Sequence, residues 1–523
     1  MIALWWLACT GPVQDSAAPL EPVQVPLEPA RLARRLSLDL RGVLPSETEL
    51  DRAEAGELDA LRNAWLADPR LEDRLVAVLG ESWHTLVDAF EAEAFEFGLD
   101  PDQEHAFERA VGEEPLRLMA RAITEGAAPA TLVTAEWTVV DPLLLPLWPL
   151  EALEQGDGPV RARYTDGRPP VGVLATNGLW WRHTTTTENA NRGRAAAIAR
   201  LLTCEELTGP VSFRVGSSLL EEDGTSTAIR EDPACQSCHD TLEPLAATLF
   251  GFWWFEANSV AELSRYHPER ELLGPQELGV TPGWMGTELA GLVELGQVVA
   301  RDPSFEPCLV QTLAQGFWRR PVDAGDDGTL AALGTELDQH QDLLALLAGV
   351  IQAPAYTAGG LTTAATDADR DRARTDRLLT PEQLATAVEE LTGFRWSIVG
   401  FDMLRTDDPG VRVLAGGVDG RSVTRPQEDP GLTWALVVQR LAQAGAWQAV
   451  ADGRLDAGLA PDDPGFTEQL QHWHRRTLGT AADDETVAGL TAMWQTVDDA
   501  DGPDAAWRAV LEALLRDPAY VSL

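Results

Sequence analysis

The sequence predicts a mainly α-helical protein of several domains, because the chain is long, its apolar residues follow helical spacing and strand-like stretches are few. Its 523 residues correspond to roughly three domains at about 150 residues each. Apolar residues make up 45% of the chain and charged residues 24%, as in folded globular proteins. Alternating, strand-like patterning is confined to two weak candidates, residues 170–176 and 411–413.

Apolar residues recur at i, i+3 and i+4 along most of the chain, which is typical of amphipathic helices. The helix at 381–391 also has a start signal, with Thr380 as N-cap, Pro381 at the first helical position and Gln383 at the capping-box position. The clearest further helices are predicted at 58–66, 115–125, 191–202 and 343–351.

Composition shifts along the chain predict its domain organisation. Segments 317–356 and 472–520 echo each other: each has an aromatic-rich helix ending in Arg-Arg, an acidic turn, a helix, and a last helix ending in Pro-Ala-Tyr. Because cations suit a helix C-terminus and Pro stops the next helix, we assign this repeat a structural role. The predicted parts are a signal segment at 1–9, a Pro-rich linker at 10–30, an N-terminal helical domain at 31–160, a middle domain with a following helical hairpin at 161–361, a linker at 362–376 and a C-terminal helical domain at 377–523.

The chain is strongly acidic, with 40 Lys+Arg against 83 Asp+Glu and a formal net charge of −43. A surface of this sign repels phosphate backbones and anionic lipid headgroups, so no nucleic-acid partner is expected. A basic redox partner or a salt-rich environment fits this charge; the alternative is that the strong use of Arg, Ala, Gly and Pro reflects a GC-rich genome.

The N-terminus has an apolar run, residues 1–8, directly before Cys9. This arrangement resembles the lipobox of bacterial lipoproteins, in which the cysteine is lipidated, although no basic residue precedes the run and Trp6 replaces the usual Leu. The alternative is an unstructured N-terminal segment with a chance cysteine. No later stretch reaches about 18 unbroken apolar residues, so no transmembrane helix is predicted.

Cys235-Gln236-Ser237-Cys238-His239 is the motif with the clearest chemistry. The spacing C-x-x-C-H is typical of c-type haem attachment, in which two thiols bind the haem vinyl groups and the adjacent imidazole is the proximal iron ligand. Two alternatives are a structural metal site, for which no second ligand pair is visible, and a dithiol redox pair, around which no βαβ pattern is found. The motif therefore predicts one covalent haem c, bound by Cys235 and Cys238 with His239 on the iron.

Two further cysteines, Cys204 and Cys308, remain once the motif and Cys9 are set aside. Haem is attached to c-type cytochromes outside the cytoplasm, where a pair of leftover thiols tends to oxidise, so we predict a Cys204–Cys308 disulfide. The alternative is two buried free thiols.

The sixth iron ligand has several candidates. Met285 lies 46 residues after the proximal histidine, as in small cytochromes c with a Met loop, and His183 precedes the helix that leads to Cys204. His267 is a third candidate. The aromatic clusters at 180–181 and 252–255, together with Trp284, are either the wall of a haem crevice or ordinary core.

These residues together resemble the planctomycete-type cytochrome c family, large secreted proteins built from several domains of unknown function. The family often has a His six residues before the first Cys of its motif, where this chain has Ile229, so the distal ligand stays open. The resemblance implies a secreted or envelope haem protein, mostly helical, with a cytochrome c-like haem domain in the middle. Segments that match are 172–174, 191–194, 201–204, the haem motif with Glu243, Pro244 and Glu256, 305–308, 319–320, 35–45, 377–393 and 416–419.

The sequence thus predicts an exported c-type haem protein that transfers single electrons in the cell envelope, on the periplasmic or outer side. Its partner is a basic redox protein, and Cys9 provides a lipid anchor. Two alternatives remain at this point. One is a haem enzyme of the peroxidase type, and the other is a surface binding or scaffold lipoprotein in which haem is structural.

Overall fold

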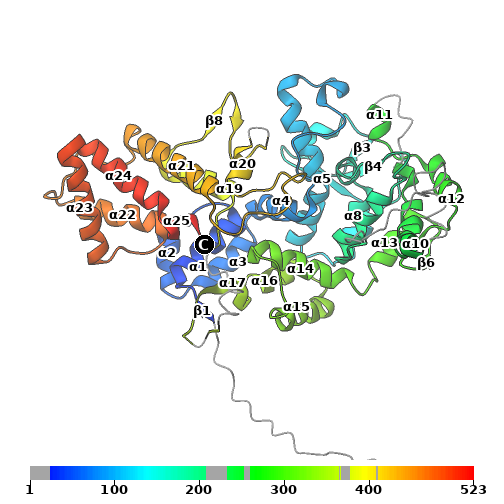
Figure 1. The fold of residues 1–523 in the computed structure, drawn as a ribbon, viewed down its shortest axis with the longest axis horizontal. Coiled ribbons are helices and arrows are strands. Elements are labelled where there is room, and N and C mark those ends of the chain that lie inside the picture. Colours follow the sequence, from blue (N-terminus) through cyan, green and yellow to red (C-terminus); the bar gives the residue numbers. More distant parts are fainter. Residues whose placement is uncertain (1–23, 208–232, 253–259, 364, 367–376, 408–409) are drawn as a thin grey trace, which may run out of the picture.

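The computed structural model describes residues 24–207, 233–252, 260–363, 365–366, 377–407 and 410–523. Over these residues the chain is 58% helix and 6% strand and has several domains, which confirms the predicted fold class at this level. In Figure 1, helices α22, α23 and α24 lie at one end of the molecule, α10 and α12 lie at the other, and α1 lies between them.

Three groups of helices follow one another along the chain. The first comprises α1 (Pro29–Arg41), α2 (Glu47–Glu54), α3 (Leu58–Leu66), α4 (Arg70–Trp83), α5 (Glu104–Thr124) and α6 (Thr131–Thr134). The second comprises α7 (Asn177–Arg182), α8 (Arg192–Thr203), α10 (Pro233–Ala247), α11 (Val260–Leu263), α12 (Leu273–Leu278), α13 (Leu292–Val299), α14 (Phe305–Trp318), α15 (Asp327–His340), α16 (Leu343–Val350) and α17 (Pro354–Thr357). The third comprises α19 (Pro381–Thr392), α20 (Val411–Leu414), α21 (Leu432–Ala451), α22 (Phe466–Leu478), α23 (Asp484–Asp501), α24 (Pro503–Arg516) and α25 (Pro518–Val521).

The predicted helices are present, with small shifts at their ends. α3 has the predicted bounds, whereas the helix expected at 115–125 is the second half of the longer α5. The capping box before α19 is confirmed, since the Thr380 side chain accepts from the Gln383 amide and the Gln383 side chain accepts from the Thr380 amide. Local cap chemistry therefore sets where this helix starts.

The described strands are short and pair only antiparallel. β2 (Thr138–Val140), β4 (Val160–Tyr164) and β3 (Leu150–Ala152) form a three-stranded sheet in that order, with Val139 opposite Arg161. The remaining pairs are β1 (Gln24–Pro26) with β7 (Ala358–Leu361), β5 (Gly283–Trp284) with β6 (Thr287–Glu288), and β8 (Ser397–Ile398) with β9 (Phe401–Asp402).

Both weak strand predictions are wrong. Residues Gly172–Ala175 form a 3-10 turn, and the stretch expected at 411–413 is the short helix α20. Three or four residues alone do not distinguish a strand from a helical turn. Residues Gly172–Ala175 are all buried, whereas in α20 the buried residue is Arg412 and the valines on either side are partly exposed.

Three main hydrophobic clusters hold the described chain together. The largest joins α1, α3, α4 and α5 to α7, α8, α10 and α13–α17, and so it crosses the domain boundary predicted at 160/161. A second cluster unites α19 and α21–α25 and also takes in Leu38 and Leu44 from the first helical group. A third, smaller cluster packs residues 87–111 against the β2–β4–β3 region and Trp181.

The close contact between α5 and α7 positions the segment that follows α7. Gly178 lies against α5 so closely that an added Cβ would be 2.1 Å from the Val111 carbonyl oxygen. Only glycine allows this approach. The contact fixes α7, and with it the position of His183 at its C-terminal end.

Candidate functional site

Helix α10 presents the three ligand-type residues of the C-x-x-C-H motif on one side. Cys235, Cys238 and His239 stand at i, i+3 and i+4, a spacing that places side chains on a single helix face. All three side chains are partly exposed, and neither thiol belongs to a disulfide. Two thiols and an imidazole on one face are what covalent attachment of a haem to this motif requires.

The ring of His239 is held by a buried carboxylate one helical turn further along α10. His239 Nδ1 lies 2.8 Å from Glu243 Oε1, and Arg192 Nε donates to the same oxygen at 2.6 Å. Glu243 is only 6% exposed. With Nδ1 bonded in this way, Nε2 is the nitrogen left for a metal.

The second oxygen of Glu243 has no hydrogen-bond partner among the described residues, although it is buried. A buried carboxylate oxygen without a partner costs free energy, and such costs concentrate at functional sites. The donor set of α10 therefore fits a haem: two thiols, one imidazole for which only the Nδ1 hydrogen bond is found among the described residues, and a carboxylate that orients the imidazole.

His183 lies at the C-terminal end of α7 with its Nε2 buried and without a hydrogen-bond partner in the described part of the chain. Burial, together with the positive charges of Arg182 and Arg200, lowers the pKa of His183 to about 3. The ring is therefore neutral at physiological pH, which is the form that binds a metal.

The backbone around His183 is connected to α10 through Arg194 of α8. Arg194 Nε donates to the His183 carbonyl oxygen at 2.7 Å, and one of its terminal nitrogens donates to the Phe252 carbonyl oxygen at 2.8 Å. Phe252 follows α10 directly in the 3-10 turn Phe250–Phe252. The structure thus brings the end of α7, the start of α8 and the end of α10 together.

Met285 occupies the turn between β5 and β6 and has a positive φ of 43°. This hairpin contacts α10, since an added Cβ on Gly283 would lie 3.2 Å from Pro244 Cβ. Met285 is partly exposed and packs against the largest hydrophobic cluster. The structure therefore places both named distal candidates, His183 and Met285, next to elements that contact α10.

His267 has both of its ring nitrogens engaged, unlike His183. Its Nδ1 lies 3.1 Å from Glu269 Oε1 and its Nε2 lies 3.1 Å from the Glu262 carbonyl oxygen. A ring that already uses both nitrogens has none left for iron, so this arrangement disfavours the third candidate.

The aromatic residues predicted as a crevice wall are mostly core in the described chain. Trp181 packs in the third cluster, 5.5 Å from Trp148 between ring centroids, and Trp284 is buried and donates to Asp302. Trp180 and Phe252 lie 5.2 Å apart beside Arg194. Residues 253–255 and Glu256 lie outside the described residues, as do Ile229 and Cys9.

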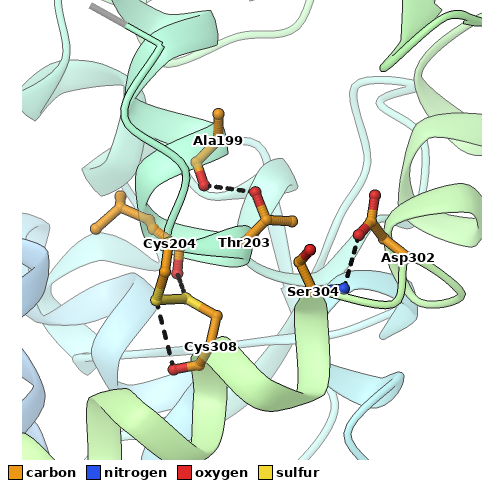
Figure 2. The surroundings of a disulfide bond; sticks show 7 residues. Ala199, Thr203, Cys204, Asp302, Ser304 and Cys308 are labelled. Atoms are coloured by element: carbon orange, nitrogen blue, oxygen red, sulfur yellow. Dashed lines mark hydrogen bonds between the residues drawn. A yellow bond between two sulfur atoms is a disulfide. The ribbon is translucent and has the colours of Figure 1, made fainter. Parts of the chain in front are cut away.

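The predicted pairing of Cys204 with Cys308 is confirmed, with the two sulfur atoms 2.07 Å apart. Figure 2 shows this bond joining the C-terminal end of α8 to the first turns of α14. Cys204 caps α8 in a left-handed conformation, and Cys308 is 3% exposed. The disulfide fixes one end of α8, and the Arg192–Glu243 ion pair fixes the other.

A cavity of about 230 Å³ lies beside the three-stranded sheet, away from the haem motif in sequence. Two residues that line it, Thr138 and Tyr164, donate to Glu114, which is fully buried and also accepts from the Gly178 amide. Burial raises the pKa of Glu114. These hydrogen bonds link α5, the sheet and α7, and no sequence motif marks them.

Other features of a site are absent from the described residues. No three His, Cys, Asp or Glu side chains in that part of the chain converge into a metal-binding group. No described helix has the length and apolarity needed to cross a membrane.

Comparison of the chain with protein-family models, with curated proteins and with solved structures found no match. The resemblance to planctomycete-type cytochromes c therefore stays a prediction. The site described above depends on this chain's own residues. The motif alone did not reveal two of its elements, namely Arg192 and the hydrogen bond from His239 to Glu243. The i, i+4 spacing of His239 and Glu243 could have indicated that bond.

Proposed function

We propose that this chain is an exported c-type haem protein that transfers single electrons in the cell envelope. The observation that carries the proposal is the arrangement on α10. Cys235, Cys238 and His239 share one helix face, and the buried Glu243 occupies Nδ1 of the histidine ring. With Nδ1 bonded, Nε2 is the nitrogen that would bind the iron.

The residues of α10 have distinct roles in this proposal. Cys235 and Cys238 would hold the haem through thioether bonds, and His239 would be its proximal ligand. When bound, the haem supplies a one-electron iron couple whose potential depends on ligands, hydrogen bonds and burial. α10 packs against α8 and the β5–β6 hairpin, which would hold the helix and its motif in place.

For the distal position we favour His183 over Met285. The Nε2 of His183 is buried and has no hydrogen-bond partner among the described residues, and a buried nitrogen in that state is costly unless something binds it. A second imidazole lowers the reduction potential, whereas the thioether of Met285 would raise it. His183 therefore makes this a low-potential electron carrier.

The partner proposed for this carrier is a basic redox protein. The net charge of −43 attracts a cationic surface and speeds its association at low ionic strength. Location in the envelope, with Cys9 as the lipid-anchored residue, is part of the same proposal.

Covalent attachment is tested directly on protein matured in the periplasm. After denaturation and electrophoresis, the polypeptide band should keep its haem in a haem stain, and the Cys235→Ala/Cys238→Ala variant should lose it. The Cys204→Ala/Cys308→Ala variant is the matched control, because it removes two thiols without touching the motif. Loss of haem from the wild-type band on denaturation contradicts the proposal.

The optical spectrum separates an electron carrier from a haem enzyme of the peroxidase type. A carrier should be low-spin and six-coordinate, and His183→Ala should make it high-spin and open to carbon monoxide while Met285→Ala and His267→Ala leave it low-spin. A wild-type protein that is already high-spin and binds carbon monoxide overturns the carrier proposal in favour of the enzyme. Conversion by Met285→Ala instead would move the distal role to the thioether.

A further inference from the structure

The hydrogen bonds around Glu243 have a second consequence, which rests on the proposed function. Oε1 of Glu243 is shared by His239 Nδ1 at 2.8 Å and Arg192 Nε at 2.6 Å, so one carboxylate oxygen serves two donors of different charge. Oε2 is buried without a partner among the described residues. An ion pair with a purely structural role would gain more by using both oxygens.

The two donors reach Glu243 from different helices. His239 lies one turn before Glu243 on α10, and Arg192 is the first residue of α8. Arg192 also donates to the carbonyl oxygens of Glu188 and Asn189, at 2.9 and 3.2 Å, which fixes its guanidinium in place. Because the disulfide at the other end ties α8 to α14, the position of Arg192 relative to α10 is set by rigid elements.

We propose that Glu243 and Arg192 are a positioning pair for the proximal histidine. Glu243 fixes the orientation of the ring and lowers the reduction potential of the haem, and Arg192 raises that potential. A carboxylate that accepts from Nδ1–H fixes the tautomer with Nε2 free and makes the imidazole a stronger electron donor, which stabilises the oxidised iron. Arg192 withdraws part of that donation because it competes for the same oxygen, and its positive charge favours the reduced iron. The potential of this protein is therefore set by a balance between two named side chains.

The test is the midpoint potential of the holoprotein with single substitutions. Glu243→Gln keeps the size of the side chain and removes its charge, and we expect it to favour reduction about tenfold, which is about 59 mV for one electron. Arg192→Gln should shift the potential in the opposite direction by a comparable factor. Asp240→Asn is the matched control, since Asp240 is an exposed carboxylate next to His239 that makes no contact with the ring in the hydrogen bonds described.

The possible results distinguish this inference from the proposed function. If the wild-type band keeps no haem after denaturation, the proposed function itself fails. If haem is attached but Glu243→Gln shifts the potential no more than Asp240→Asn does, or if Glu243→Gln and Arg192→Gln shift it in the same direction, the positioning pair is overturned and the haem assignment stands. If Glu243→Gln does not incorporate haem, the Arg192→Gln variant alone tests the inference. A midpoint potential that falls supports the positioning pair, and one that rises overturns it.

Discussion

Two four-helix units of this molecule have the same order of elements and differ in how they are attached to the rest. The first consists of α14, α15, α16 and α17, and the second of α22, α23, α24 and α25. Each begins with a helix of 13 or 14 residues and ends in a four-residue helix that contains Pro-Ala-Tyr. In Figure 1 they lie on different sides of α1.

Neighbouring arginines of α1 connect to the two tyrosines. Arg35 donates to the carbonyl oxygens of Tyr356 and Ala358, and Arg34 donates to the Tyr520 carbonyl oxygen at 2.7 Å. Arg34, Arg35 and both tyrosines are buried. One helix therefore binds the ends of both units through two consecutive residues of the same type.

The two junctions differ in what happens to the tyrosine hydroxyl. Tyr356 donates to Asp39 at 2.9 Å, and Arg377 also donates to the Tyr356 carbonyl oxygen at 2.8 Å. The hydroxyl of Tyr520 is buried and has no hydrogen-bond partner in the described chain. The first unit is thus attached by a polar network around the Tyr356 hydroxyl and by a disulfide. The second is attached by Arg34, by the ion pairs of Arg475 with Asp51 and Glu54, and by the apolar cluster that takes in Leu38 and Leu44. Similar helical sequences can be secured by different physical means.

The largest expected effect comes from removing the bond that only the first unit has. Cys204→Ala/Cys308→Ala opens a covalent loop of about one hundred residues, and we expect the free energy of unfolding to fall by about 3–5 kcal/mol. Hydrogen exchange should show lost protection in α14–α16 and unchanged protection in α22–α24. Equal loss in both units would contradict the view that they are secured separately.

The next effect should come from the Tyr356 hydroxyl. Tyr356→Phe leaves Asp39, which is 5% exposed, with Gln383 as its remaining side-chain partner at 2.9 Å. A buried carboxylate that loses a hydrogen bond costs about 2–3 kcal/mol, to be measured by urea unfolding. An unchanged midpoint and slope would show that the network contributes nothing to the attachment of the first unit.

The repeat was recognisable in the sequence, but the difference between its copies was not. Helical periodicity, the capping box at Thr380 and the shared Pro-Ala-Tyr endings are local patterns, and local rules predict them. The hydrogen bond from Tyr356 to Asp39 joins residues 317 positions apart, and a single sequence does not show which tyrosine has such a partner.

In the candidate site, too, local patterns were predictable from the sequence and long-range contacts were not. The motif at 235–239 and the Cys204–Cys308 pairing follow from spacing and from the number of cysteines, which are visible in the sequence. The orphaned Nε2 of His183 and the Arg192–Glu243 ion pair depend on how α7, α8 and α10 pack. The strand expected at 411–413 failed because four apolar and basic residues next to α21 fold as a helical turn.

The stability of the C-terminal side should also depend on pH through Asp407, which pairs with Arg412, as Glu382 does. Burial raises the pKa of Asp407 to about 6, against the opposing effect of Arg412 and with a contribution from Asp88. Between about pH 4 and 6 the folded protein then holds a proton that the unfolded chain has released, so the free energy of unfolding falls as pH rises through this window. Glu382 has the opposite sign, because Arg412 overcomes its burial and lowers its pKa to about 2.

In wild type, we expect the free energy of unfolding to fall by about 1–2 kcal/mol between pH 4 and 6 because of Asp407. The Asp407→Asn variant should lack this fall. Urea unfolding of wild type and variant at pH 4.5 and pH 6.5 measures the difference. Asp326→Asn, in the first unit, is the matched control, since Asp326 also pairs with an arginine, Arg320, at 2.6 Å. A wild-type stability that rises steadily from pH 4 to 6, with the same slope in Asp407→Asn, would contradict the assignment.

The smallest effect is expected at the second junction, and it is the sharpest test of the comparison. Tyr520→Phe keeps the ring, over which Arg34 lies at 5.3 Å from the centroid, and removes a hydroxyl that is buried without a partner among the described residues. On folding, such a hydroxyl loses its hydrogen bonds to water and forms none in the protein. Its removal should therefore change the free energy of unfolding by less than about 0.5 kcal/mol or slightly raise it. Measured beside Tyr356→Phe in the same urea titration, the two substitutions differ only in which copy of the repeat they enter. A loss at Tyr520 as large as the loss at Tyr356 would mean that the second hydroxyl also has a partner, and that both units are attached to α1 by the same polar chemistry.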